Sequence, residues 1–67
     1  MSIEWVRKTY SVPAKRGTRV EYSGTEPPQM GTITGAQGGY VCIRLDGKTH
    51  SQPYHPTWKL RYITDDQ

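Results

Sequence analysis

Phenylalanine is absent from this sequence of 67 residues, and cysteine occurs once, at Cys42. A single cysteine excludes an internal disulfide and a zinc site built from cysteines. Without phenylalanine, the two tryptophans and five tyrosines must supply the aromatic volume of the core. A chain this short hides only about 60% of its unfolded surface. We therefore expect one marginal domain, for which formation of a homo-oligomer is an available support.

Long apolar runs are also missing. No run of about 18 apolar residues occurs, so the sequence predicts no transmembrane helix and no membrane partner. Residues 1–8 contain neither the apolar segment nor the cleavage site of a signal peptide. We therefore expect a reduced, cytoplasmic setting.

Acidic residues are few. Nine lysines and arginines are set against six acids, which gives a formal charge of +3 and a pI near 9.2. Two of these acids, Asp65 and Asp66, lie near the C-terminal end, so the preceding part, with nine cations and four acids, carries a formal +5. A basic balance of this kind favours polyanionic partners.

The segment 17–45 has the clearest structural pattern. Glycines at 17, 24, 31, 35, 38 and 39 divide it into short runs with β-strand character. Alternation of apolar and polar residues predicts strands at 19–22, 31–35 and 40–45, followed by weaker strands at 48–52 and 60–63. Two glycines at 38–39 and Asp46-Gly47 are hairpin turn signals, and Gly35 predicts a bulge or a sharp bend. Pro27 and Pro28 make 23–30 a long loop.

These elements predict an all-β fold, namely a small SH3-like barrel of about five antiparallel strands with a 3₁₀ turn at 56–58 before the last strand. The predicted core consists of Val6, Val12, Val20, Ile33, Val41, Ile43, Leu45, Leu60 and Ile63. Residues 1–12 fit a strand or one to two helical turns, and we favour an extended arm packed on the barrel. The barrel itself is predicted to span 13–64, and an acidic tail at 65–67 is predicted to be frayed.

The series Gly17-x-Arg-Val, Gly31-Thr-Ile, Tyr40-Val and Leu45-Asp resembles the opening of SH3-like barrels of the KOW type. Such barrels bind RNA, ribosomes or transcription machinery, and the resemblance implies a role of that kind. The compact basic chain with its His-Pro-Thr-Trp segment is also similar to small uncharacterised proteins of phages and prophages.

Candidate catalytic and metal-binding residues are sparse. His50 and His55 are five residues apart, whereas a metal site needs three or four converging ligands. Cys42 would need a base and an orienting group to act as a nucleophile; we interpret it as a half-buried strand residue. The sequence contains no paired carboxylates and no phosphate-binding loop. We therefore predict a protein that is not an enzyme and that has neither a metal nor a cofactor.

A group of basic and aromatic residues near the C-terminal half is the strongest functional signal. The members predicted to share one binding wall are Tyr40, Arg44, Lys48, Tyr54, Trp58, Lys59 and Arg61. Cations bind phosphates and flat rings stack on bases, so this combination predicts nucleic-acid binding. Lys15, Arg16 and Arg19 would extend the basic rim.

Two questions remain open, the burial of the aromatic residues and the kind of partner. Because aromatic volume is scarce, we favour a core position for Trp58, while Tyr40 and Tyr54 fit the core and the surface equally. On the second question, the alternative is a protein-interaction or self-associating module that does not bind nucleic acid. Tyr22, Tyr54 and Trp58 beside the Pro27-Pro28 loop would then form a peptide groove.

Overall fold

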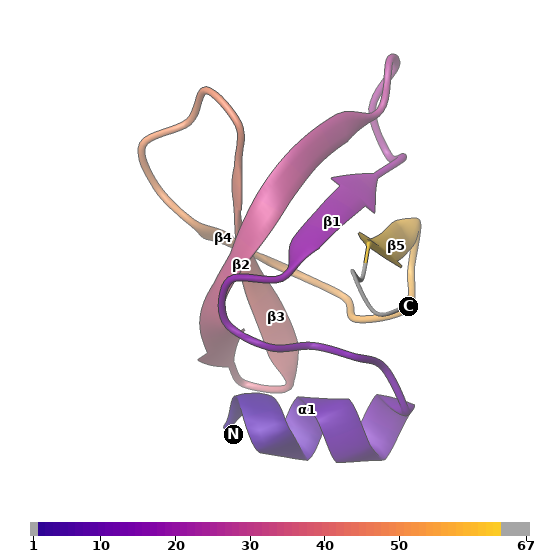
Figure 1. The fold of residues 1–67 in the computed structure, drawn as a ribbon, viewed down its shortest axis with the longest axis vertical. Helices are drawn as coiled ribbons and strands as arrows, with labels where there is room; N and C mark the ends of the chain where they lie inside the picture. Colours follow the sequence, from indigo (N-terminus) through magenta and orange to yellow (C-terminus); the bar gives the residue numbers. More distant parts are fainter. Residues whose placement is uncertain (1, 64–67) are drawn as a thin grey trace.

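Five antiparallel strands and one short helix form the fold of this chain, seen here in a computed structural model that describes residues 2–63 (Figure 1). The elements are α1 (Ile3–Tyr10), β1 (Arg19–Tyr22), β2 (Gln29–Gln37), β3 (Tyr40–Leu45), β4 (Gln52–Tyr54) and β5 (Leu60–Ile63). The strands form a single sheet in the order β4-β3-β2-β1-β5. The prediction of five antiparallel strands is therefore confirmed. The predicted frayed tail at 65–67 and the predicted end of the barrel at residue 64 lie outside the described residues.

The N-terminal segment is helical, so the extended arm predicted within 1–12 is wrong. The side-chain oxygen of Ser2 caps α1 by accepting a hydrogen bond from the backbone N–H of Trp5 at 3.2 Å. Glu4 in the first turn and Lys8 in the last turn both complement the helix dipole. Ser11 ends the helix in the left-handed conformation, with φ 55°. Within residues 2–63, no helix is long and apolar enough to cross a membrane.

One face of α1 packs on the sheet. Ile3, Val6 and Tyr10 follow the three- and four-residue spacing of a helical face, and Val6 is fully buried. Figure 1 shows α1 lying across the end of the sheet, where it contacts both β2 and β3. The N-terminal segment therefore contacts the sheet through one face of a helix.

Strict alternation places the core along β3. Val41, Ile43 and Leu45 are buried, whereas Tyr40 and Arg44 are exposed on the opposite face. The pairing of β2 with β3 shifts between residues 33 and 35, which confirms the bulge predicted at Gly35.

The buried core differs from the predicted core at a few positions. The buried hydrophobic residues are Val6, Ala14, Val20, Ile33, Val41, Ile43 and Leu45. Ala14 was not predicted, and neither was the buried Pro56. Val12 and Leu60 are half-buried against the core. Ile63 is 36% exposed, because it pairs with Arg19 on the outer face of the sheet.

The fourth strand lies further along the chain than predicted. It covers Gln52–Tyr54 in place of 48–52, and Pro53 pairs with Cys42 inside it. Proline is tolerated here because β4 is an edge strand and needs no further backbone donor. Residues 46–51 are consequently a loop that stands beside the sheet.

The connection from β4 to β5 contains one hydrogen-bonded turn where a 3₁₀ turn was predicted. The backbone N–H of Trp58 donates to the carbonyl of His55 at 3.4 Å. Pro56 is buried, and its carbonyl accepts a 2.8 Å hydrogen bond from the Tyr62 hydroxyl. These contacts fix the path of the connection.

Candidate binding groove

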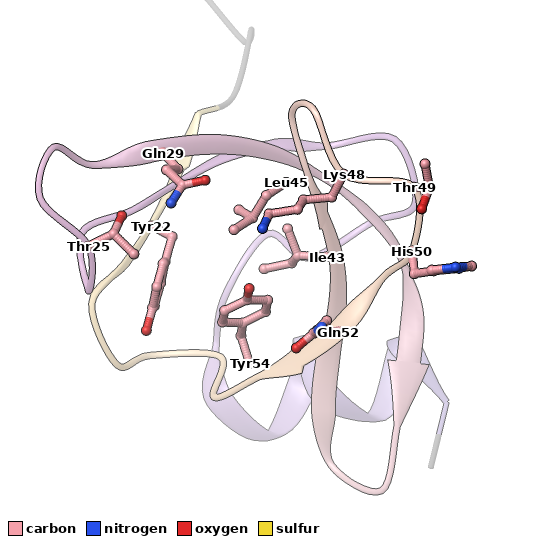
Figure 2. Close-up of a pocket in the computed structure, with 10 residues that line it drawn as sticks. All are labelled: Tyr22, Thr25, Gln29, Ile43, Leu45, Lys48, Thr49, His50, Gln52 and Tyr54. Atoms are coloured by element: carbon pink, nitrogen blue, oxygen red, sulfur yellow. The ribbon is translucent and has the colours of Figure 1, made fainter.

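A groove lies between the 23–28 loop, the 46–51 loop and β4, with the inner face of β3 at its base (Figure 2). Its volume is about 370 Å³, within the range of roughly 300–1,000 Å³ that is common for ligand sites. We refer to it as the concave groove. Ile43 and Leu45 form its apolar floor.

Gly31 allows this floor to form. It lies on β2 opposite Leu45, and a Cβ atom there would lie 2.7 Å from Cγ2 of Ile43 and 3.0 Å from the carbonyl oxygen of Arg44. A side chain at this position would therefore displace the residues that make the floor.

Three aromatic side chains, which we call the aromatic wall, lie together: Tyr22 and Tyr54 line the groove, and Trp58 lies next to Tyr22. The rings of Tyr22 and Tyr54 have centroids 4.8 Å apart, and those of Tyr22 and Trp58 are 6.5 Å apart. Tyr22 ends β1, Tyr54 ends β4, and Trp58 lies in the connection that follows. Burial, and to a smaller extent the neighbouring Tyr22, raises the pKa of Tyr54 above its ordinary value. The Tyr54 phenol is therefore neutral near pH 7 and can both donate and accept a hydrogen bond.

Two lysines accompany the aromatic wall. Lys48 comes from the 46–51 loop, and Figure 2 shows its side chain reaching toward the middle of the groove. The ammonium of Lys59 lies 5.2 Å from the centroid of the Trp58 ring, a cation–π contact. Among the described residues that line the groove, none is acidic. The groove therefore presents positive charge beside flat aromatic surfaces.

The remaining polar lining consists of neutral hydrogen-bonding groups. Gln29 and Gln52 contribute amides to the wall, and Thr25 contributes a hydroxyl whose proton is directed to the carbonyl of Pro27 at 2.9 Å. Each amide carries both donors and an acceptor. The groove can thus form hydrogen bonds with a polar ligand edge while its floor remains apolar.

The predicted binding wall is divided between two faces of the sheet. Tyr54 pairs with the buried Val41 and so lies on the inner face, whereas Tyr40 and Arg44 alternate onto the outer face. Arg61 also points outward, where it forms a 2.8 Å ion pair with Glu21. Of the predicted set, Lys48 and Tyr54 line the groove, and Trp58 and Lys59 lie next to it through the contact of Trp58 with Tyr22. A single wall containing all seven residues does not form.

The predicted core position of Trp58 is wrong. Its side chain is 56% exposed, because the buried Pro56 occupies the interior next to Tyr62 instead. Tyr40 is 48% exposed, and Tyr54 is half-buried. Sequence reasoning placed Tyr22 only in the alternative peptide groove. Its alternation with Val20 was the signal that puts it on the inner face.

A second aromatic group, which we call the end cluster, lies beside α1. It comprises Trp5, Tyr10, Tyr40 and His55, joined by centroid distances of 6.2, 5.3 and 6.4 Å. Nδ1 of His55 accepts a 3.1 Å hydrogen bond from the backbone N–H of Thr57, so the neutral ring carries its proton on Nε2.

The outer face carries paired charges. Arg19 contacts Asp46 at 2.7 Å and also donates to the hydroxyl of Thr32 at 2.8 Å. The hydrogen bonds from Arg19 hold the pKa of Asp46 below its ordinary value. Arg19, predicted as part of a basic rim, is therefore already engaged by an acid. Exposed pairs of this kind contribute little to stability.

The two histidines occupy different environments. His50 lines the rim of the concave groove, and Figure 2 shows its ring pointing away from the interior. His55 belongs to the end cluster. Within residues 2–63, no group of three or more potential metal ligands gathers at one place.

Comparisons of this chain with protein-family models, with curated proteins and with solved structures gave no match. A function for this chain therefore has to be inferred from the geometry of the concave groove.

Proposed function

We propose that this chain is a non-catalytic binding module that holds single-stranded nucleic acid in the concave groove. One observation carries the proposal, namely that Tyr22, Tyr54 and Lys48 line a groove whose described lining has no acid. Trp58 lies beside Tyr22 at the edge of this groove, with the ammonium of Lys59 next to its ring. Rings offer stacking surfaces to bases, and lysines neutralise phosphates. Under this proposal the binding site is on the inner face of the sheet, away from Tyr40, Arg44 and Arg61.

The groove suits a single strand better than a duplex. In a duplex the flat faces of the bases are covered by their neighbours, whereas an unpaired strand can turn a base onto Tyr22, Tyr54 or Trp58. Lys48 and Lys59 flank these rings and would contact the phosphates on either side of a stacked base. The amides of Gln29 and Gln52 would bond to base edges.

The finer fold assignment is part of the same proposal. Consecutive strands pair in order from β1 to β4, and β5 returns to pair with β1. This order, together with the bulge in β2, supports an SH3-like barrel. The sequence resemblance to KOW-type barrels agrees with a nucleic-acid partner.

Fluorescence anisotropy with labelled oligonucleotides of about 12 nucleotides tests the proposal. Wild-type protein should bind single strands with micromolar affinity at low salt and should bind the matched duplex more weakly. The logarithm of the affinity should fall with the logarithm of salt concentration by about 0.7 for each phosphate contacted. Lys48→Ala and Lys59→Ala should each reduce that slope by about 0.7, which corresponds to the loss of one phosphate contact.

Arg61→Ala is the matched control, because it also removes one positive charge but from the outer face. If all three variants weaken binding equally, net charge explains the binding and the groove does not. If wild-type protein shows no micromolar binding to single strands at about 50 mM salt, the proposal is wrong.

A protein-interaction role is the second candidate, and the end cluster is the feature that favours it. Trp5 is 37% exposed and contacts Tyr10, and Tyr40 is 48% exposed and contacts His55. Exposed aromatic groups of this kind are enriched in protein interfaces. Sedimentation velocity would detect self-association, and Tyr40→Ser should abolish it if the end cluster forms the contact. A monomer at all concentrations would remove self-association from consideration.

A further inference from the structure

Lys59 has an unusual backbone conformation. Its φ is 54°, in the left-handed region that residues other than glycine rarely adopt. The other such residue in the described chain, Ser11, ends α1, where this conformation is common. Lys59 follows no helix. It lies between the turn at 56–58 and the first residue of β5.

Ser23 holds this conformation in place. Its backbone N–H donates to the carbonyl of Lys59 at 2.9 Å, and its hydroxyl donates to the same oxygen at 3.3 Å. Ser23 directly follows Tyr22, which is itself paired with Leu60. The segments that carry Tyr22 and Trp58 are therefore joined by the pairing of β1 with β5 and, next to Trp58, by the two hydrogen bonds to the Lys59 carbonyl.

The same segment leaves Trp58 exposed on a fixed backbone. The N–H of Trp58 is bonded to the carbonyl of His55, and the preceding Pro56 is buried. The Trp58 ring nevertheless remains 56% exposed, with the ammonium of Lys59 5.2 Å from its centroid. An exposed tryptophan usually loses conformational freedom when it binds a ligand. In the free protein these two contacts already hold the backbone that carries the ring.

We propose that Lys59 is a positioning residue whose left-handed backbone, held by Ser23, fixes Trp58 beside the groove before a ligand arrives. The identity of the ligand, single-stranded nucleic acid, rests on the proposed function, whereas the positioning of Trp58 does not. Glycine would adopt this conformation without strain, but it would supply neither the rigidity nor the ammonium. Strained residues of this kind concentrate at binding sites because a fixed geometry favours binding.

Lys59→Gly and Lys59→Ala separate backbone strain from charge, since both remove the ammonium and only glycine relieves the strain. A left-handed conformation carries a free-energy cost for a residue other than glycine. Because glycine avoids this cost, Lys59→Gly should have a melting temperature about 4–8 °C above that of Lys59→Ala in a domain of this size. Lys15→Ala, in the exposed segment before β1, is the control for loss of a lysine, and its melting temperature should equal that of wild type. Equal melting temperatures for the two Lys59 variants would show that residue 59 is not strained, and would overturn the proposal.

Time-resolved fluorescence anisotropy with selective excitation of tryptophan reports the mobility of Trp58 directly, in a Trp5→Phe background that leaves one tryptophan. Ser23→Ala and Lys59→Gly should both increase the local motion of Trp58, and Lys15→Ala should not. Ser23→Ala should also weaken oligonucleotide binding about threefold, and Ser23→Thr, which keeps the hydroxyl, should restore it. Unchanged Trp58 motion in both variants would refute the positioning role.

These readouts keep the two proposals apart. If wild-type protein does not bind oligonucleotides, the proposed function fails, while the melting temperatures and the Trp58 anisotropy still decide whether Lys59 positions Trp58. If binding occurs but is insensitive to Ser23→Ala, the groove binds without this positioning, and the inference fails alone.

Discussion

Gly24→Ala should disturb the aromatic wall without removing any of its rings. A Cβ atom at Gly24 would overlap the hydroxyl end of the Tyr22 ring, at Oη, Cζ and Cε2. Gly24 is not among the glycines with positive φ, so alanine carries no backbone penalty there. The substitution therefore acts through one contact, and the Tyr22 ring must rotate away.

The cost of that rotation follows from the contacts of Tyr22. Its ring lies 4.8 Å from that of Tyr54 and 6.5 Å from that of Trp58, and aromatic pairs are worth about 0.5–1.5 kcal/mol. We expect a loss of about 1 kcal/mol in the free energy of unfolding, which lowers the melting temperature by about 4–8 °C. Loss of one stacked base, worth about 1–3 kcal/mol, should weaken oligonucleotide binding by about tenfold or more.

Thermal melts and oligonucleotide anisotropy on the same samples measure both effects. Gly35→Ala is the control, because its Cβ would meet only Nε of Arg16 at 3.8 Å, an ordinary contact. In a Tyr22→Leu background, Gly24→Ala should weaken binding no further, since the two changes remove the same ring contact. Full additivity in this cycle, or wild-type binding by Gly24→Ala, would refute the assignment of Tyr22 to the binding site.

Three further predictions concern other parts of the molecule. Burial raises the pKa of Tyr62 to about 12, above its ordinary value of 10, so the folded state favours the neutral phenol. The contribution of this group to the free energy of unfolding is therefore complete below pH 10 and is lost as the pH rises toward 12. That shift corresponds to at most about 2.7 kcal/mol, and we expect about 1 kcal/mol for this half-exposed ring, so alkaline melts of Tyr62→Phe should decline less steeply than those of wild type. Arg19 lowers the pKa of Asp46, so the contribution of the Asp46 carboxylate to stability is present above pH 4 and is lost as the pH falls below that value. In urea melts at pH 2–5, Asp46→Asn should therefore lack this part of the acid dependence of stability. Tyr40→Ala, on the outer face, should keep oligonucleotide affinity within about twofold in anisotropy titrations, and a tenfold loss would move the binding site to that face.

The strand pattern was predictable because it depends on local alternation. Val41, Ile43 and Leu45 repeat every second residue, and only an inward-facing strand explains such a run in a short chain. The helix was not predictable in the same way. The pattern of residues 4–10 fits a short strand as well as one to two helical turns, and α1 owes its stability largely to the burial of Val6, a contact with distant parts of the chain.

The division of the predicted binding wall has a related cause. Sequence reasoning placed β4 at 48–52, and the structure has it at Gln52–Tyr54. The correct register depends on β4 being an edge strand, which the chain's own pattern does not reveal. That register sets Tyr54 opposite Val41 on the inner face, and so separates it from Tyr40 and Arg44.

Trp58 was misplaced for a reason that bears on function. In a chain without phenylalanine, full burial of a large side chain would add roughly 1.5–3 kcal/mol, which is a substantial share of the few kcal/mol available to a small domain. The fold instead buries Pro56 and leaves more than half of Trp58 in solvent. The next residue, Lys59, has a left-handed backbone, which the sequence does not indicate because no glycine stands at that position. Both features lower stability, and both place the ring beside Tyr22 and the ammonium of Lys59. An exposed ring kept at the expense of stability is what the proposed binding function would require.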